Sequence, residues 1–128
     1  MEVSPRGGGN RIAELQDMAT GQSLIRAEIC KALSLPMDEI KAPEYDGVWC
    51  NNILHSSVEG TLELIDINPE FEQKYIKDKG FIVEEGDHIV PFTGANTSLG
   101  TLFLRAETRE ELDRELANIN NNVRIRLS

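Results

Sequence analysis

The side chains best suited to do chemistry gather at the start of the sequence. Glu2 is a carboxylate at the end of a short apolar stretch, and Arg6 follows four residues later. Carboxylates bind Mg²⁺ well, and arginine holds phosphate or carboxylate groups through its two-pronged guanidinium. The glycines Gly7, Gly8 and Gly9 come next, and they allow backbone N–H groups to approach an anion. In outline, this segment predicts a site for an anion and a metal ion.

The same segment also has a purely structural interpretation, which the residues alone leave open. Its spacing matches neither the P-loop nor the dinucleotide-binding fingerprint. Residues 1–3 suit the end of a strand, residues 4–9 a flexible turn, and Asn10 the cap of a helix over residues 11–19 that Gly21 ends. The anion-site interpretation and the structural interpretation both predict a turn that leads into a helix. A helix N-terminus favours negative charge, so this local structure is also compatible with a bound anion.

The elements that follow predict an α+β fold. Apolar side chains at three-to-four spacing predict a second helix over residues 24–33, which Pro36 closes. Apolar runs predict strands over residues 48–55 and 61–67, and we expect these two to pair as an antiparallel hairpin. The remaining predicted elements are a helix over 69–76, strands over 81–84, 88–90 and 99–106, a capped helix over 108–119 and a strand over 123–127. Two N-terminal helices are therefore expected before a mostly antiparallel sheet with two further helices packed on it.

The opening segment resembles the last active-site strand of ATP-grasp ligases. The family usually has Glu-x-Asn-x-Arg, a glycine turn and helix, and then an Ala-Thr-Gly stop, which here is Ala19-Thr20-Gly21. The family joins a carboxylate to an amine, thiol or similar nucleophile through an acyl phosphate made with ATP and Mg²⁺. Ser4 stands where the family usually has the asparagine metal ligand.

The resemblance implies a role for each residue of the segment. Glu2 and Ser4 would be the magnesium ligands, and Arg6 would be the catalytic residue that holds the acyl phosphate or the substrate carboxylate. The residues that would bind the substrate are Gly7, Gly8, Gly9, Asn10 and Arg11.

The resemblance also implies how the chain is organised. Residues 1–36 would be the tail of the ATP-grasp catalytic domain, and residues 37–128 a small C-terminal α+β sheet domain. The family's ATP-binding lysine pair, glycine-rich lid and earlier acidic metal ligand have no match here. We therefore expect a C-terminal part of a larger ligase that is inactive alone and binds neither ATP nor Mg²⁺ by itself. Its expected partners are the missing N-terminal ATP-grasp part, a small-molecule carboxylate substrate and a second copy in a homodimer.

Two other classes of function remain open. The chain could be a non-catalytic α+β module that packs on a partner subunit. It could also be a stand-alone domain that binds a small anion at the glycine turn.

The composition limits the classes of binding partner and the cellular compartment that we expect. The net charge of −9 disfavours nucleic acid and anionic membrane surfaces. The sequence has no apolar run of the roughly 20 residues that a membrane span needs, and no signal-peptide pattern, so we expect a cytoplasmic location. Cys30 and Cys50 are expected to be buried free thiols, since their spacing does not suit zinc. His55 is interpreted as a hydrogen-bonded residue at a strand end, with a role as a base left open, and His88 as a solvated turn residue.

Overall fold

The computed structural model describes residues 9–128. These residues form two compact units, which we describe separately. Unit 1 comprises the described residues up to Gly47, and unit 2 comprises Val48–Ser128.

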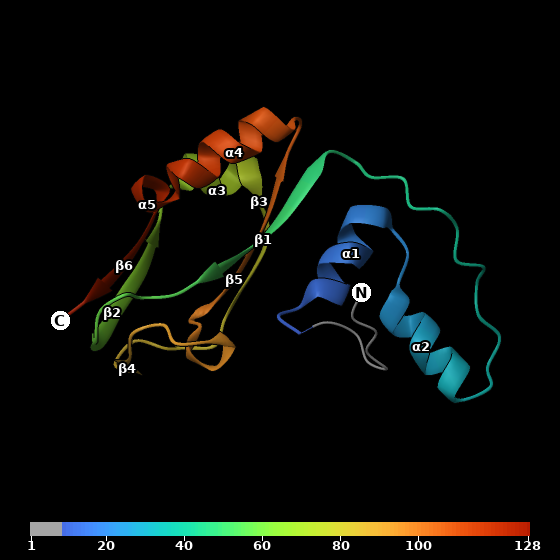
Figure 1. Cartoon of the computed structure of the whole chain (residues 1–128), viewed down its shortest axis with the longest axis horizontal. Coiled ribbons are helices and arrows are strands. Elements are labelled where there is room, and N and C mark those ends of the chain that lie inside the picture. The colour runs from blue at the N-terminus through green and yellow to red at the C-terminus, as the bar shows by residue number, and fades with distance from the viewer. Residues whose placement is uncertain (1–8) are drawn as a thin grey trace. The chain divides into compact units, whose positions relative to one another are not determined.

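Unit 1 consists of two helices and an extended connector (Figure 1). Helix α1 spans Ile12–Thr20 and helix α2 spans Leu24–Ala32. Gly21 ends α1 with a left-handed backbone (φ 67°), as predicted, because glycine adopts this conformation without steric cost. The connector over residues 33–47 is tied back to the helices by Gln22. The Gln22 side chain accepts a hydrogen bond from the Lys41 N–H (2.7 Å) and donates one to the Lys41 carbonyl (3.2 Å).

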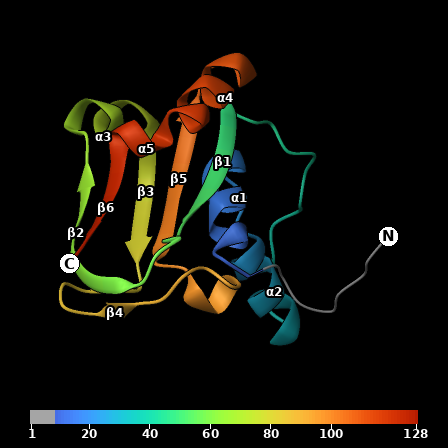
Figure 2. The same cartoon turned by 60° about the vertical axis from the view of Figure 1, so that its left-hand side comes forward.

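Unit 2 contains two three-stranded antiparallel sheets. In the first sheet the order is β1-β5-β3, formed by Val48–Leu54, Gly100–Ala106 and Ile76–Phe81. In the second sheet the order is β4-β2-β6, formed by His88–Ile89, Gly60–Ile67 and Val123–Leu127. Figure 2 shows β2 beside β6, and β5 between β3 and β1.

The predicted hairpin between residues 48–55 and 61–67 is wrong. Strand β1 pairs with β5, from Val48 opposite Ala106 to Leu54 opposite Gly100, and β2 pairs with β4 and β6. Strand β5 is buried at nearly every position, so it takes the centre of its sheet. Strand β3 begins at Ile76, directly after the third helix. The sequence predicted that this strand would begin only at residue 81, so the predicted start is wrong. The expected single sheet is therefore two sheets.

Three helices of unit 2 lie on the same side of the strands in both views (Figures 1 and 2). They are α3 (Pro69–Tyr75), α4 (Arg109–Ala117) and the short α5 (Ile119–Asn122). A single 3₁₀ turn spans Ala95–Thr97. Asn68 caps α3, with its Oδ1 atom accepting from the Glu70 N–H at 2.9 Å, and Thr108 caps α4 by accepting from the Glu111 N–H at 3.2 Å. The predicted α+β class is confirmed.

The core of unit 2 lies between the strands and these helices. Leu102 and Leu104 of β5 are fully buried, and Phe71 of α3 and Leu112 of α4 belong to the same cluster. Gly100 has a packing role beside this core, because a Cβ atom there would collide with the Gly80 carbonyl oxygen of β3. Within residues 9–128, no helix is long and apolar enough to cross a membrane.

Candidate functional site

The structure describes three of the predicted site residues: Gly9, Asn10 and Arg11. The other predicted site residues lie outside the described residues; they are Glu2, Ser4, Arg6, Gly7 and Gly8. The local geometry of the candidate site is therefore that of the turn which leads into α1.

This turn is tight and open on one side. Asn10 and Arg11 both have left-handed backbones, with φ values of 56° and 61°. The Ile12 N–H donates to the Gly9 carbonyl at 3.3 Å, and a Cβ atom added at Gly9 would have no neighbour within 4 Å. Left-handed backbone costs energy for residues other than glycine, and two such residues in succession are uncommon. Such strain concentrates at functional sites, which makes this turn a candidate for one.

The capping position at the N-terminus of α1 is Arg11, and among residues 9–128 no side chain provides a capping hydrogen bond there. The prediction that Asn10 caps this helix is wrong, because the capping position is Arg11 and Asn10 lies one residue before it. The helix dipole favours an anion at this end of the helix.

The Arg11 guanidinium is held at the turn by a carboxylate one helical turn away. Its Nε atom donates to Glu14 Oε2 at 2.7 Å, and an Nη atom of the same side chain lies 2.6 Å from that oxygen. This pair fixes the orientation of Arg11 and offsets its charge. An anion bound at the turn would therefore compete with Glu14 for the Arg11 guanidinium.

The described residues fit an anion better than a metal ion. Between residues 9 and 128, no group of three His, Cys, Asp or Glu side chains could hold a metal ion. The predicted magnesium ligands, Glu2 and Ser4, fall outside this range. What the described turn offers is an open glycine position and the N-terminus of a helix.

Comparison with known proteins shows which fold the chain has. Neither a protein-family model nor a curated protein sequence matches the chain. The solved structures that it matches include phosphoribosylglycinamide synthetase from Anaerococcus prevotii (TM-score 0.70, 22% identity) and L-amino acid ligase from Bacillus licheniformis (TM-score 0.75, 20% identity). The matches cover 94% and 95% of this chain, and both proteins are ATP-grasp ligases. The chain has the fold of part of an ATP-grasp ligase.

The predicted resemblance to ATP-grasp ligases is thus confirmed at the level of the fold. The chain spans only about a third of each ATP-grasp ligase that it matches, namely 31% and 30% of their lengths.

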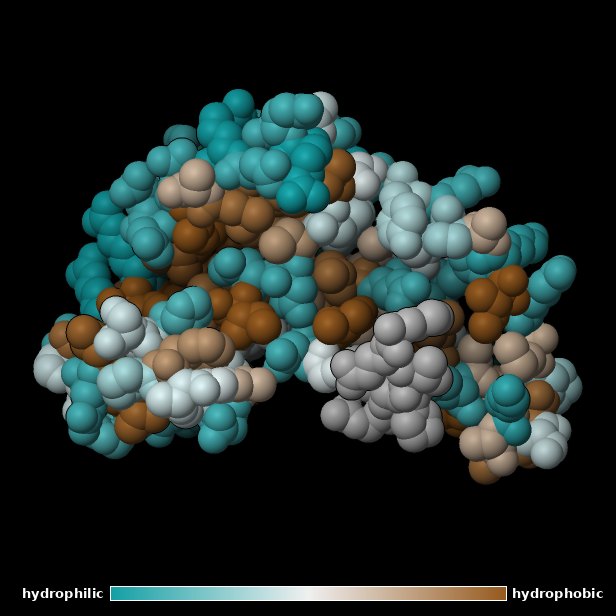
Figure 3. Space-filling model, in the orientation of Figure 1, coloured by the Kyte–Doolittle hydropathy of each residue, from teal (hydrophilic) through white to brown (hydrophobic). Residues whose placement is uncertain are grey.

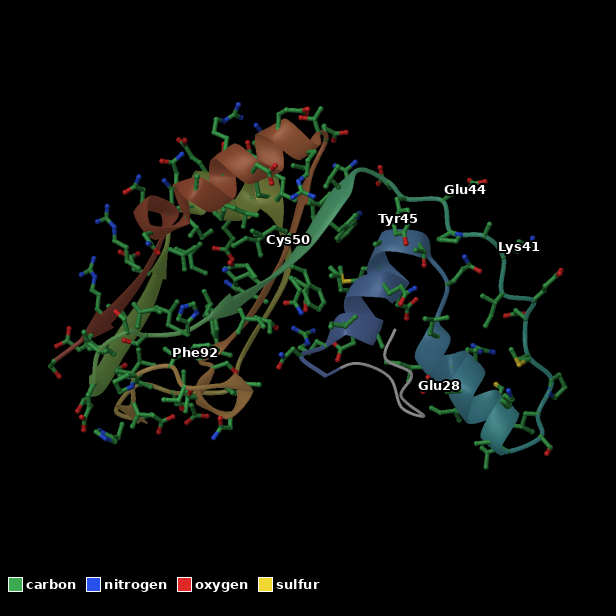
Figure 4. All side chains as sticks on the ribbon, in the orientation of Figure 1. Glu28, Lys41, Glu44, Tyr45, Cys50 and Phe92 are labelled. Atoms are coloured by element: carbon green, nitrogen blue, oxygen red, sulfur yellow. The ribbon has the colours of Figure 1, made fainter. Side chains whose placement is uncertain are left out.

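The two histidines, His55 and His88, lie outside the turn and contact neighbouring residues of unit 2. The His55 Nδ1 atom lies 3.2 Å from the Ile53 carbonyl oxygen, and its ring packs against Phe92 with centroids 4.7 Å apart. Phe92 follows β4, and it is labelled in Figure 4. His88 lies in β4 rather than in a turn, and its Nε2 atom is 3.2 Å from Glu59 Oε1 at the surface. The contact of His55 agrees with its interpretation as a hydrogen-bonded residue. His88 is exposed, as expected, but the prediction that it lies in a turn is wrong.

Both cysteines are free, as expected, but neither is fully buried. Cys30 and Cys50 are each half-buried. Burial raises the pKa of the Cys50 thiol, and the positive charge of Arg109 opposes this only in part. A raised pKa leaves less thiolate at neutral pH, so Cys50 is a poor nucleophile.

The sequence analysis missed one polar cluster, which joins α3 to α4. The Tyr75 hydroxyl donates to Glu111 Oε1 at 2.8 Å, and the Lys74 ammonium donates to the Tyr75 oxygen at 2.8 Å. Lys74 also lies 3.0 Å from Glu111 Oε1. These hydrogen bonds, with one from the Glu107 N–H, lower the pKa of Glu111 to about 2. The cluster fastens the two helices to each other, and it lies on unit 2 rather than at the candidate site.

Proposed function

We propose that the chain is the C-terminal part of an ATP-dependent ligase, which joins a carboxylate to an amine or thiol through an acyl-phosphate intermediate. The observation that carries this proposal is the fold match to two ATP-grasp ligases over 94% and 95% of the chain. The ligase motif in residues 2–11 supports the same function independently, because it was recognised in the sequence alone.

In this proposal the opening segment forms one wall of the active site. Glu2 and Ser4 bind the magnesium ions of ATP, and Arg6 holds the acyl phosphate or the substrate carboxylate. Gly7 and Gly8 bind the substrate together with Gly9, Asn10 and Arg11. The open position at Gly9 and the dipole at the start of α1 support an anionic ligand at this end of the segment.

The chain acts with a partner in this proposal. The remaining ATP-grasp part supplies the rest of the ATP site, so the 128-residue chain is inactive alone and retains no ATP or Mg²⁺. The coverage of about a third of each matched ligase supports this division. The isolated chain forms a homodimer through its exposed apolar surface, and the complete enzyme works in the cytoplasm.

The test is ADP release by the chain together with the remaining ATP-grasp part, expressed as a separate polypeptide, against a panel of carboxylates and amines. ADP formation should depend on the carboxylate and require both parts. Replacing Arg6 with alanine should lower kcat by roughly 100-fold or more, the usual loss on removing a group that stabilises transition-state charge. Arg124→Ala is the control, because Arg124 is exposed on β6 of unit 2. Equal ADP formation with and without this chain would refute the proposal.

The second candidate is a non-catalytic module that packs on a partner subunit. It is favoured by the apolar side chains that unit 1 leaves exposed. Assembly of the two parts without any carboxylate-dependent ADP release would select this alternative.

A further inference from the structure

A cavity of about 280 Å³ lies within unit 1, between α2 and the connector. Its walls come from the turn after α1, from one side of α2 and from residues 37–40 of the connector. Its lining residues all belong to unit 1, and they lie outside the candidate site at residues 2–11. The cavity is therefore a feature that the proposed function does not use.

Hydrogen bonds tie the connector to α2 at both ends of this cavity. The chain reverses after α2 at Ser34, which has a left-handed backbone (φ 53°), and the Leu35 N–H donates to the Cys30 carbonyl at 2.8 Å. At the other end, the two hydrogen bonds between Gln22 and Lys41 hold the connector beside the start of the helix. Residues 37–40 lie between these two attachments, so they form a defined wall of the cavity.

Part of the lining is apolar. It includes five apolar side chains, which are Leu24, Ala27 and Cys30 of α2 and Met37 and Ile40 of the connector. Figure 3 shows apolar and hydrophilic side chains intermixed over α2 and the connector. Apolar walls bind the apolar body of a ligand, and pockets for drug-sized ligands have volumes of roughly 300–1,000 Å³. This cavity therefore suits a ligand that is smaller than a drug-sized molecule.

The lining also carries an excess of negative charge. It includes the carboxylates of Asp17, Asp38 and Glu39 and one cation, Arg26, which together leave a net charge of −2. None of these three carboxylates forms an ion pair with another residue in the range 9–128. They do not converge as metal ligands either, since no three acidic, His or Cys side chains of this range could hold a metal ion. The charge therefore favours a cation that is larger than a metal ion.

We infer that this cavity binds a small organic amine, with the ammonium group among the carboxylates and the apolar body against α2. An ammonium group has three N–H donors, and hydrogen bonds from a cation to a carboxylate are stronger than those between neutral groups. A neutral ligand of the same shape lacks this attraction, and a carboxylate ligand is repelled. The inference is independent of the proposed ligase activity, because the cavity and the candidate site share no residue.

The first experiment compares three probes that share one apolar body: phenethylamine, 2-phenylethanol and 3-phenylpropionate. Each is titrated into the 128-residue chain, and the NMR shifts of the Cys30 and Met37 amides give its dissociation constant. We expect phenethylamine to bind about 5-fold more tightly than 2-phenylethanol, and 3-phenylpropionate to bind most weakly. Equal binding of the amine and the alcohol would overturn the inference. So would shifts at Cys30 and Met37 that are no larger than the shift at Leu104 of β5.

The second experiment uses matched variants. Glu39→Gln removes a carboxylate from the lining, and Glu28→Gln removes one from an exposed position of α2 outside it, labelled in Figure 4. We expect Glu39→Gln to weaken phenethylamine binding about 3-fold without affecting 2-phenylethanol, and Glu28→Gln to affect neither. Equal losses of amine binding in the two variants, or no loss in either, would overturn the inference.

A second pair of variants tests the apolar wall. Ala27→Phe fills the cavity and should abolish the binding of both phenethylamine and 2-phenylethanol. Ile29→Phe adds bulk at an exposed position of the same helix outside the lining, so it should leave binding unchanged. Circular dichroism checks that both variants keep the helix content of the unaltered chain. Full phenethylamine binding by a folded Ala27→Phe variant would place the amine elsewhere and overturn the inference.

Discussion

The two units of this chain differ in how they bury their apolar side chains. In unit 2, the β5 residues Gly100 to Leu104 are all buried, and side chains from α3 and α4 complete a core. Among the described residues of unit 1, only Ala19 is buried. Unit 1 nevertheless exposes nine large apolar side chains, and the longer unit 2 exposes six. The difference indicates that unit 2 is stabilised by its own core, whereas the described residues of unit 1 form no comparable core.

The largest expected effect is on the free energy of unfolding, and it is tested with one side-chain truncation in each unit. Leu104→Ala should destabilise unit 2 by about 3 kcal/mol, because it leaves a cavity in a fully packed site. Ile29→Ala should change the stability of the isolated chain by less than about 0.5 kcal/mol, since Ile29 is half exposed. Urea unfolding is followed by the fluorescence of Trp49, the only tryptophan, which reports on unit 2, and by circular dichroism, which also reports on the helices of unit 1. Similar losses in the two variants would contradict the contrast.

A smaller effect is expected at the two helix caps. Asn68→Ala should destabilise unit 2 by about 1 kcal/mol, because the Asn68 side chain accepts from two backbone N–H groups of α3. Ser23 caps α2 in the same way. Ser23→Ala should leave the Trp49 transition in place and lower only the helix content of the chain, as measured by circular dichroism. A shift of the Trp49 transition on Ser23→Ala would mean that the two units unfold together.

The smallest expected effect is a pH dependence confined to unit 2. The folded pKa of Glu111, about 2, lies below the ordinary value of 4.5. Glu111 therefore contributes stability that is complete above pH 4.5 and is lost as the pH falls from 4.5 toward 2. Urea midpoints measured across this range should fall less steeply for Glu111→Gln. Lys74→Met, which removes the largest cause of the shift, should move the loss to higher pH. If the urea midpoints of both variants depend on pH in the same way as those of the unaltered chain, the cluster of Lys74, Tyr75 and Glu111 does not stabilise unit 2.

Features set by neighbouring residues could be predicted from the sequence. Gly21 ends α1, Asn68 and Pro69 begin α3, and Thr108 begins α4, because each depends on hydrogen bonds within one helical turn. The pairing of β1 with β5 could not be predicted, since an alternating pattern shows that a strand exists without naming its partner. The chain between the two strands spans residues 55–99, and the pattern carries no information across that distance.

The candidate site was likewise predictable only in part. The motif gave the residue types and their proposed roles, but it did not reveal that Asn10 and Arg11 are left-handed. The pair between Arg11 and Glu14 was available in the sequence, because residues three apart on a helix are neighbours. The contact of Tyr75 with Glu111 was not, since the two residues lie 36 positions apart and meet only after α3 and α4 have packed.

The most direct test of the contrast between the units is hydrogen–deuterium exchange of the isolated chain and of its complex with the remaining ATP-grasp part. We predict slow exchange for the amides of Leu102, Phe103 and Leu104 in both samples, because β5 is the centre of its sheet. Amides of α2 should exchange quickly in the isolated chain and slowly in the complex. Exchange in α2 that is already as slow as in β5 in the isolated chain would contradict the account.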